Sequence, residues 1–476
     1  MIKTVLENAF IVSMDASLGN IPRADVLVEG ERIAAVGPNL GVEDAERIDC
    51  TDCIVMPGLI DTHRHVWQGA IRSVTGDWSL NDYFRGIRMN VANAYTPEDM
   101  YAAHFHGGLE ALDAGITTVV DYCHNLNTPD HAYETIRGLR DSGARVVWAF
   151  GFNRPPLDDP HFKSTEERAT FARELARRYF SDPSCRVTMA VAPEEAHFWR
   201  HDPPRGLAQF ALARELGIPV TWHCNSSSDR ETGNHLRDAA RIAKLGLLGP
   251  DVLLVHLNIT DPDEWVMVAD SGAGVSFTPD TELQMGMGWS PTEMARLFGI
   301  SQSYGADIIS NNTGDLITAL RLALQTARCR MHIKEFGEKL ADRPGVHIPA
   351  SEALAWGTID AARALGMDDR IGSITPGKQA DILVIPTNTI PLVGWDRTNP
   401  AATLILQAHG RDVHTVFVAG EKVKDKGRLT AGAERAVGLL RAANERITEK
   451  MSERGGYLHV SPEDSIARAR ALRTQA

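Results

Sequence analysis

The segment Pro57-Gly58-Leu59-Ile60-Asp61-Thr62-His63-Arg64-His65 is an apolar run that ends in two histidines separated by one residue. Side chains alternate across a β-strand, so His63 and His65 would share one face of it. Two neutral imidazoles on one face can begin a divalent metal site, because nitrogen is a preferred donor. The chain contains 17 histidines, so packed core histidines are the alternative interpretation of this pair alone.

Three later segments have the same form, an apolar run with a candidate ligand at its end. They are Pro219-Val220-Thr221-Trp222-His223, Val252-Leu253-Leu254-Val255-His256 and Gly305-Ala306-Asp307. A single histidine at the end of a strand is more often a hydrogen-bonded core residue. Three such endings in order after the first pair favour a shared site.

The composition is that of a large globular protein. The 476 residues suffice for a large core and a smaller second unit, and 43% hydrophobic and 23% charged residues are ordinary values. A formal net charge of -13 argues against a nucleic-acid partner and an anionic membrane surface. We see no bilayer-spanning stretch and no signal-peptide core, so we expect a cytoplasmic protein without a membrane partner.

The six cysteines are too scattered for a disulfide framework. Cys50 and Cys53 form a CxxC without a second pair nearby, and we interpret them as structural thiols rather than as a metal or redox pair. Cys224 follows His223 directly and would face the other side of the strand, which predicts a core position.

Between about 58 and 345, strand-like runs alternate with amphipathic helical stretches. The remaining strand-like runs include Thr117–Asp121, Arg145–Phe150 and Arg186–Ala192, and the helical stretches include Thr165–Tyr179 and Arg205–Leu216. This alternation predicts parallel βα units, and the length is near the roughly 250 residues of a closed eight-stranded barrel. Residues at the strand ends would then converge at one mouth.

The motifs resemble those of the amidohydrolase superfamily, in particular its cytosine deaminase, chlorohydrolase and S-adenosylhomocysteine deaminase branch. The matching stretches are Pro57–His65, Ala111–Val119, the strand ends at His223 and His256, and Gly372–Val384. They span nearly the whole chain. The resemblance implies an α/β fold, a (β/α)8 TIM barrel with a small β-sandwich domain formed by the N- and C-terminal segments.

We therefore expect three parts. Residues 1–57 and 370–430, which contain short β-rich runs, would form the composite β-sandwich domain, and residues 58–369 the barrel. Residues 431–476 would form a C-terminal helical tail. Its stretch Ala433–Glu453 is rich in Arg and Glu, which is typical of a solvated face or of a subunit contact, and we expect a homo-oligomer.

His63, His65, His223 and Asp307 are the predicted metal ligands. A catalytic zinc site needs about three protein ligands and an open water position, which this set allows. We prefer Asp307 to Asp315, because Asp315 follows an Asn-Asn-Thr-Gly turn and suits the start of the next helix. We expect zinc, with iron as the alternative, and a bound divalent ion can lower the pKa of its water to about 7.

The resemblance assigns further roles. Many superfamily members hold two metal ions bridged by a carboxylated lysine at the end of the fourth strand, and Arg186–Pro193 contains no lysine, which implies a single ion. His256 resembles the histidine that hydrogen-bonds the attacked group in single-metal deaminases, with a fifth ligand as the alternative. Asp307 would accept the proton of the water and pass it to the departing nitrogen.

One motif departs from the family pattern. Typical deaminases of this branch have His-x-x-Glu after the fifth strand, and this chain has His223-Cys224-Asn225-Ser226. Ser226 can donate a hydrogen bond, but it cannot act as a carboxylic acid. The change weakens a purine or pyrimidine deaminase assignment and leaves room for hydrolysis of an amide, a urea or a heteroaryl C–N or C–Cl bond.

Several polar and aromatic residues near the strand ends are candidate substrate contacts. Aromatic faces beside a metal suit a flat ring, and a few polar groups would fix its orientation. Packing at a hinge or a solvated loop is the alternative for each of them. The candidates are Trp67, Gln68, His197, Trp199, Ser226, Glu282 and Gln284.

The sequence thus predicts a metal-dependent hydrolase that removes an amino or similar substituent from a small nitrogen-containing aromatic or heterocyclic substrate. Hydrolysis of an amide, anilide or urea C–N bond is the second hypothesis. A non-catalytic binding scaffold is the third, and it would be expected to have lost the metal ligands that this chain retains.

Overall fold

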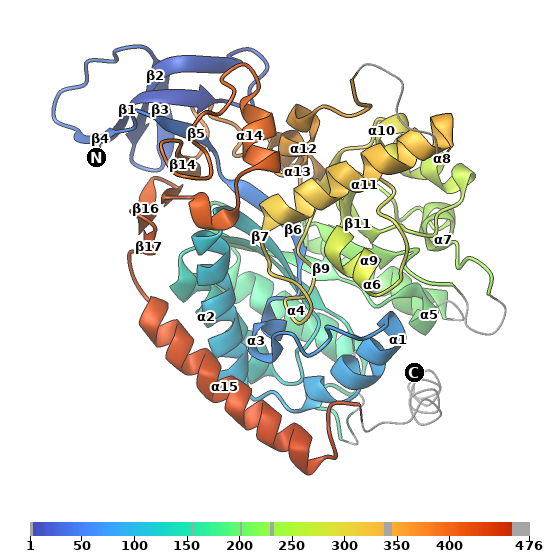
Figure 1. Cartoon of the computed structure of the whole chain (residues 1–476). Coiled ribbons are helices and arrows are strands. Elements are labelled where there is room, and N and C mark those ends of the chain that lie inside the picture. Colours follow the sequence, from blue (N-terminus) through green and yellow to red (C-terminus); the bar gives the residue numbers. More distant parts are fainter. Residues whose placement is uncertain are drawn as a thin grey trace.

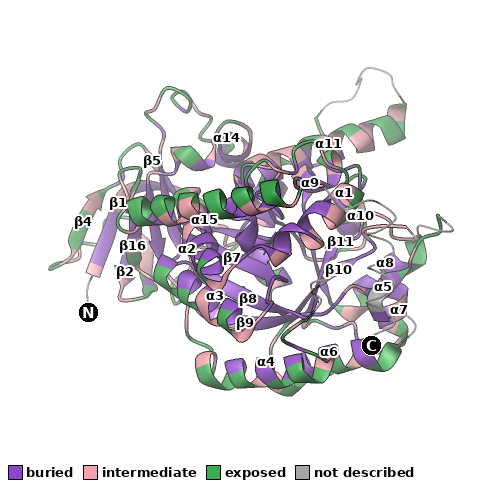
Figure 2. Ribbon diagram, turned by 90° about the horizontal axis from the view of Figure 1, so that it is seen from below, coloured by how far each residue is buried: buried purple, intermediate pink, exposed green. Residues whose placement is uncertain are grey.

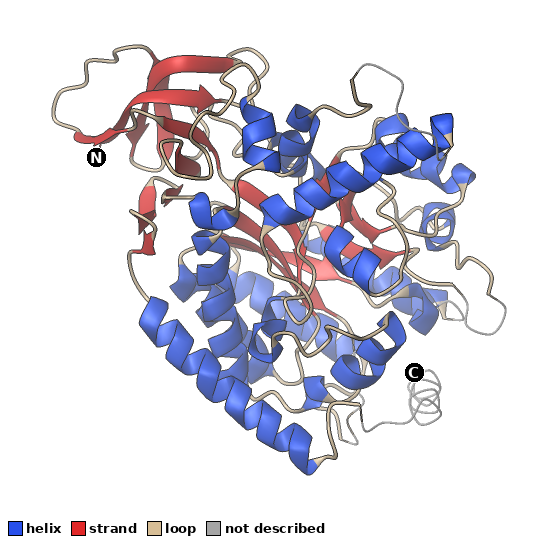
Figure 3. Ribbon diagram, in the orientation of Figure 1, coloured by secondary structure: helices blue, strands red, loops and turns tan. Residues whose placement is uncertain are grey.

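A parallel barrel and a mixed sheet beside it organise the chain in the computed structural model (Figure 1). The barrel strands follow one another in chain order, and helices surround them (Figure 3). The structure describes residues 3–153, 157, 159–199, 202–228, 233–337 and 345–458. Within these residues, no helix combines the length and apolarity needed to cross a membrane.

The barrel has eight parallel strands, as the alternation predicts. Strands with buried residues on both faces are typical of a parallel sheet covered by helices, and all eight residues of β7 are buried (Figure 2). The strands are β6 (Leu59–Arg64), β7 (Ile116–Cys123), β8 (Arg145–Gly151), β9 (Val187–Ala192), β10 (Val220–Cys224), β11 (Val252–His256), β12 (Gly274–Phe277) and β13 (Gln302–Tyr304).

Helices fill the connections between the strands and cover the barrel. The longer ones are α2 (Pro97–Asp113), α3 (Pro129–Ser142), α4 (Thr165–Tyr179), α6 (Pro203–Leu216), α8 (Pro262–Ser271) and α11 (Leu316–Phe336). The short ones are α1 (Leu80–Tyr83), α5 (Ala196–Trp199), α7 (Asp238–Lys244), α9 (Pro279–Gln284), α10 (Thr292–Leu297), α12 (Ala350–Trp356), α13 (Ile359–Ala364) and α14 (Pro400–Leu406). Single turns are η1 (Val66–Ile71), η2 (Phe84–Arg88), η3 (Val91–Asn93) and η4 (Gly410–Asp412).

Hydrogen bonds between the first and last barrel strands close the barrel. The hydroxyl groups of Thr62 and Ser303 lie 2.8 Å apart, and beyond the end of β13 the amide of Asp307 donates to the carbonyl of His63 at 2.8 Å. Gly305 is required at this closure, because a Cβ there would lie 2.3 Å from the carbonyl oxygen of His63. The closure therefore brings the first and last predicted ligands to the same place.

The second sheet has nine strands and mixes the two ends of the chain. Its order is β17-β16-β15-β14-β5-β1-β2-β3, with β4 paired to β1. The N-terminal strands are β1 (Lys3–Val12), β2 (Asn20–Glu29), β3 (Arg32–Gly37), β4 (Glu46–Asp49) and β5 (Cys53–Pro57). The C-terminal strands are β14 (Ile382–Pro386), β15 (Thr415–Val418), β16 (Glu421–Asp425) and β17 (Arg428–Leu429). The predicted pairing of both chain ends is thus confirmed, while the domain boundaries stay predictions.

The side-chain alternation of β5 explains how this sheet joins the barrel. Ile54 and Met56 belong to the large core that the sheet shares with the barrel, whereas Val55 belongs to a separate core of the sheet.

Cys50 is buried in that second core, and burial raises its pKa to about 12, which keeps the thiol neutral. The CxxC thiols are free in the structure, in agreement with a structural role.

The C-terminal helix α15 (Ala433–Glu453) has the predicted bounds and lies along α2 (Figure 1). Asn444 donates a hydrogen bond to the carbonyl of Ala70 at 2.7 Å, and Arg435 donates to the hydroxyl of Tyr101 at 2.6 Å. The predicted tail beyond residue 458 lies outside the described residues.

A buried ion pair also connects the barrel to the mixed sheet. Arg145 at the start of β8 donates two hydrogen bonds, of 2.9 and 3.0 Å, to the carboxylate of Asp381 before β14. The same carboxylate accepts from the amide of Ala419 at 2.7 Å. Both charged side chains are buried, so each depends on the other for its charge balance.

We predict that Asp381→Ala destabilises the protein by about 3 to 5 kcal/mol, because it leaves the Arg145 guanidinium buried without its carboxylate. The measurement is the midpoint of thermal unfolding. The control is Glu421→Ala, which removes the exposed ion pair between Glu421 and Arg186 and should cost less than about 1 kcal/mol. If both variants lowered the midpoint of thermal unfolding by the same amount, the buried ion pair would stabilise the protein no more than the exposed one.

Candidate functional site

The four predicted metal ligands lie together where the barrel strands end. The Oδ1 atom of Asp307 lies 3.3 Å from Nε2 of His63 and 3.4 Å from Nε2 of His65. The Nε2 atoms of His63 and His223 lie 3.3 Å apart. The donors come from β6, from β10 and from the turn after β13, as the strand-end pattern predicts.

These three distances equal the spacing of neighbouring ligands around a divalent ion, and His63 belongs to both groups with metal-ligand spacing, His63-His65-Asp307 and His63-His223-His256. Bond lengths of about 2.0–2.1 Å at tetrahedral angles separate neighbouring ligand atoms by about 3.3–3.4 Å. Burial and the neighbouring His63 hold the pKa values of His65 and His223 well below the ordinary value, so both rings are neutral and can donate a lone pair. Burial opposes the charge of Asp307, but the hydrogen bond and charge of His63 outweigh it and lower the pKa of Asp307.

A second set of groups orients the ligands. Nδ1 of His65 donates to the carbonyl of Tyr122 at 2.8 Å, and Nδ1 of His223 donates to Oε1 of Glu195 at 3.2 Å. Each bond fixes the tautomer in which Nε2 carries the lone pair that faces the cluster. Asn153 in turn donates to the other oxygen of Glu195 at 2.6 Å.

His256 adjoins the cluster and has its own carboxylate partner. Nδ1 of His256 lies 3.3 Å from Oε1 of Glu282, and His63, His223 and His256 form a further group with metal-ligand spacing. Burial opposes protonation of His256, but the hydrogen bond to Glu282 and the charges of Asp307 and Glu282 raise its pKa. The structure therefore keeps open both roles, ligand and hydrogen-bond donor.

Two residues of the site have a strained backbone. His256 and Asp307 have φ angles of 78° and 58°, which non-glycine residues rarely adopt. Such strain persists where the surrounding structure imposes it, and it is common at functional sites.

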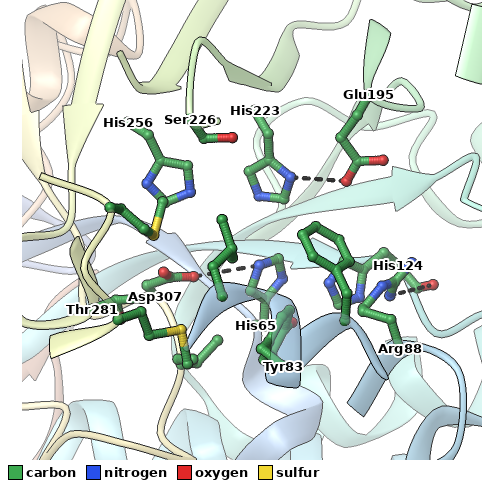
Figure 4. Close-up of a pocket in the computed structure, with 15 residues that line it drawn as sticks. His65, Tyr83, Arg88, His124, Glu195, His223, Ser226, His256, Thr281 and Asp307 are labelled. Carbon is green, nitrogen blue, oxygen red and sulfur yellow. Dashed lines mark hydrogen bonds and ion pairs between the residues drawn. The ribbon is translucent and has the colours of Figure 1, made fainter. Parts of the chain in front are cut away.

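A pocket of about 470 Å³, its open mouth included, lies over the cluster (Figure 4). Among the sequence-predicted residues it is lined by His65, His223, Ser226, His256 and Asp307. Its apolar wall consists of Leu80, Phe84, Met285, Met287 and Ile308. The other polar residues that line it are Tyr83, Arg88, His124, Glu195 and Thr281.

Three of the predicted substrate contacts lie behind the pocket surface. Trp67 is fully buried and donates to Nδ1 of His124 at 3.1 Å, and Gln68 donates to the hydroxyl of Tyr83 at 2.8 Å. Glu282 is fully buried and contacts His256, because the turn that starts α9 directs its side chain inward. At these positions the three side chains contact the pocket-lining residues His124, Tyr83 and His256, and their predicted role in substrate binding stays a prediction.

The remaining predicted contacts differ in position. Ser226 lines the pocket, whereas Trp199 is buried and donates to the carbonyl of Glu194 at 2.9 Å. Gln284 is exposed and donates to the carbonyl of Gly76 at 2.8 Å, because it lies on the outward side of α9. The side chain of His197 lies outside the described part of the structure.

The pocket is also lined by four residues that the sequence patterns above do not predict, Tyr83, Arg88, His124 and Glu195. His124 directly follows β7, so the strand-end signal used for the ligands could have found it, and its ring stacks on His65 with 4.1 Å between centroids. Glu195 follows β9 and carries the same signal. Tyr83 and Arg88 lie in the long connection after β6, where no sequence pattern distinguishes them from solvated residues.

The choice between two neighbouring carboxylates agrees with the structure. Asp315 accepts hydrogen bonds from the amides of Ile317 and Thr318 at 3.0 and 3.4 Å and caps the N-terminus of α11. Asp307 alone of the two lies in the ligand cluster.

Comparison with known proteins identifies the family. Residues 54–423 match the amidohydrolase family, and the chain belongs to it. The predicted superfamily and the predicted class, a hydrolase, are therefore confirmed.

Individual proteins are similar over most of the chain. The 5-methylthioadenosine/S-adenosylhomocysteine deaminase of Symbiobacterium thermophilum is 28% identical over 398 residues, which cover 81% of this chain and 85% of that protein. A zinc-bound adenosine deaminase from Xanthomonas campestris has a TM-score of 0.79 at 23% identity, covering 94% of this chain and 98% of the other. A variant of atrazine chlorohydrolase from Arthrobacter aurescens TC1, complexed with zinc and atraton, has a TM-score of 0.80 at 23% identity, covering 93% and 100%.

We predict that His223→Ala lowers the zinc retained after dialysis by about tenfold or more, because one nitrogen donor is lost. The measurement is elemental analysis of the purified protein by mass spectrometry. His235→Ala is the matched control, since His235 is exposed and pairs with Asp261 outside the cluster. Unchanged zinc in His223→Ala would rule out the proposed ligand set.

Proposed function

We propose that this protein is a metal-dependent hydrolase that removes an amino group from a small nitrogen-containing ring. The observation that carries the proposal is the cluster of three imidazoles and one carboxylate beneath a pocket with an apolar wall. The similarity to a deaminase of adenosine derivatives and to a chlorohydrolase crystallised with atraton supports a heterocyclic substrate.

We propose one divalent ion, zinc rather than iron, held by His63, His65, His223 and Asp307. When bound, such an ion lowers the pKa of a water toward neutrality and thereby supplies a nucleophile. β9 contains no lysine that could bridge a second ion. Two metal equivalents per active chain, or iron as the metal of the active protein, would contradict this part of the proposal.

Asp307 acts as the proton carrier. Its lowered pKa keeps the carboxylate charged at neutral pH, so it can accept a proton from the attacking water. It then delivers that proton to the departing nitrogen, because its carboxylate lines the same pocket as the substrate ring.

His256 polarises the bond under attack. With Nδ1 against Glu282, its Nε2 can donate to the nitrogen or oxygen on which charge develops. Glu282 also accepts from the amide of Thr278 at 3.0 Å and from the hydroxyl of Ser290. These bonds hold the carboxylate in place and so fix the direction of the His256 ring.

Hydrolysis of an amide or urea is the second candidate, and Ser226 is the observation that favours it. Ser226 lines the pocket where related deaminases carry a carboxylic acid, so protonation of a ring nitrogen lacks its usual donor. Ammonia release from aminated heterocycles, compared with amine release from anilides and ureas, separates the two candidates.

The pocket over the cluster, about 470 Å³ with its open mouth, supports a small-molecule substrate. The net charge of -13 supports the absence of a nucleic-acid partner, and we propose a cytoplasmic homo-oligomer on the basis of composition and of the Arg- and Glu-rich helix α15.

We predict that Asp307→Asn lowers kcat by about 10²- to 10⁴-fold or more while some metal is retained, because the amide cannot carry the proton. Steady-state kinetics on the metal-loaded protein measure the change. Asp315→Asn is the control, since it alters a helix cap outside the cluster and should keep kcat near the wild-type value. Near-normal turnover of Asp307→Asn would exclude the mechanism.

We predict that Glu282→Gln moves the alkaline limb of kcat/KM to lower pH. A raised pKa keeps His256 protonated to higher pH, and removal of the Glu282 charge lowers that pKa, so the protonated form is lost earlier on the alkaline side. The pH profile of the metal-loaded variant measures the shift. A uniformly reduced rate with an unmoved alkaline limb would show that protonated His256 is not required.

A further inference from the structure

Arg88 brings a positive charge into the pocket and forms an ion pair with neither of the carboxylates that line it, Glu195 and Asp307. Its side chain lines the pocket, and its Nη1 donates one long hydrogen bond of 3.4 Å, to the carbonyl of His124 (Figure 4). Across the described residues, no ion pair includes Arg88, although Glu195 lines the same pocket. A guanidinium has five N–H donors, so most of its hydrogen-bonding capacity remains for a ligand.

An unusual helical turn places Arg88 there. Residues Phe84–Arg88 form a π-helix, and the amide of Met89 donates to the carbonyl of Phe84, five residues earlier, at 3.1 Å. This wider turn brings Tyr83 and Arg88, five residues apart, onto the same side of the helix. Single π-turns are rare and occur frequently at functional sites.

The turn is fixed by its neighbours. Ser79 caps the preceding helix α1 through the amide and carboxylate of Asp82. The ring of Trp78 packs against Gly86. A side chain is excluded at position 86, because a Cβ there would lie 2.3 Å from that ring. The position of Arg88 in the pocket therefore follows from packing around the turn.

Tyr83 offers a second donor beside Arg88. Its hydroxyl accepts from Gln68 at 2.8 Å, and Gln68 in turn accepts from Ser310 at 2.8 Å. Burial raises the pKa of Tyr83, so the hydroxyl keeps its proton. That proton remains available for an acceptor in the pocket.

We propose that Arg88, together with Tyr83, binds a carboxylate carried by the substrate ring. A planar guanidinium matches the two oxygens of a carboxylate, and such a ligand would balance the charge of Arg88 inside the pocket. The inference deepens the proposed function and rests on it, since it names the class of ring that the same site accepts.

The arrangement of the pocket also gives the orientation of the ring. In Figure 4, His256, Thr281 and Asp307 lie on one side and Arg88 and His124 on the other. The carboxylate would thus lie on the edge of the ring away from the departing amino group. Contact between the guanidinium and a neutral oxo group or ring face is the competing outcome.

Matched pairs of rings test the inference by catalysis. The pairs are cytosine with cytosine-5-carboxylate and pterin with pterin-6-carboxylate, and the readout is ammonia release by the zinc-loaded protein. In at least one pair, wild type should prefer the carboxylate member in kcat/KM. Arg88→Gln should reduce that preference by about tenfold to a hundredfold, the usual size of a charged hydrogen bond. Arg88→Lys, which keeps the charge, should retain part of it.

Arg85→Gln is the matched control, since Arg85 lies in the same turn, pairs with Asp82 and does not line the pocket. It should leave the preference unchanged. No preference for a carboxylate in wild type, or an equal preference in wild type and Arg88→Gln, would overturn the inference. An undiminished preference in Arg88→Gln would indicate that the carboxylate binds elsewhere in the pocket, for example at the metal.

Calorimetry separates failure of the inference from failure of the proposed function. The titrants are uracil and uracil-5-carboxylate, and pterin and pterin-6-carboxylate, added to the zinc-loaded protein. Tighter binding of a carboxylate that depends on Arg88 supports the inference even if no ring releases ammonia. Ammonia release without any Arg88-dependent preference in rate or binding leaves the proposed function standing and rejects the inference.

Discussion

The site depends on two backbone hydrogen bonds. One joins His63 to Asp307, and the other joins Asp307 to His65. The amide of Asp307 donates to His63 at 2.8 Å, and the amide of His65 donates to Asp307 at 2.7 Å. These bonds join the first and last strands of the barrel at the level where their ligands project. The same two hydrogen bonds therefore close the barrel and bring the metal donors together.

Bringing the metal-donor side chains together in the core costs free energy. Burial of several imidazoles around one carboxylate costs less free energy where the nitrogens that face away from the cluster are hydrogen-bonded. Glu195, Glu282 and the carbonyl of Tyr122 provide those bonds from three different strand ends. These bonds fix which nitrogen of His65, His223 and His256 faces the cluster, whereas Nδ1 of His63 is buried without a hydrogen-bond partner among the described residues.

Much of the fold and the ligand set could be predicted from the sequence because both depend on local patterns. Apolar runs with a ligand at the end located His63, His65, His223, His256 and Asp307, and the turn before Asp315 marked it as a helix cap. The residues that line the rest of the pocket carry no such pattern. Trp67 and Glu282 follow strand ends but turn into the core, whereas Arg88 reaches the pocket through a π-turn that only tertiary packing around Gly86 reveals.

The most direct test of the account is anomalous diffraction at the zinc edge from crystals of the metal-loaded protein. The account predicts a single peak within about 2.0–2.2 Å of the Nε2 atoms of His63, His65 and His223 and of an oxygen of Asp307. A peak at another place, or crystals of fully active protein without any anomalous metal at these four residues, would contradict it.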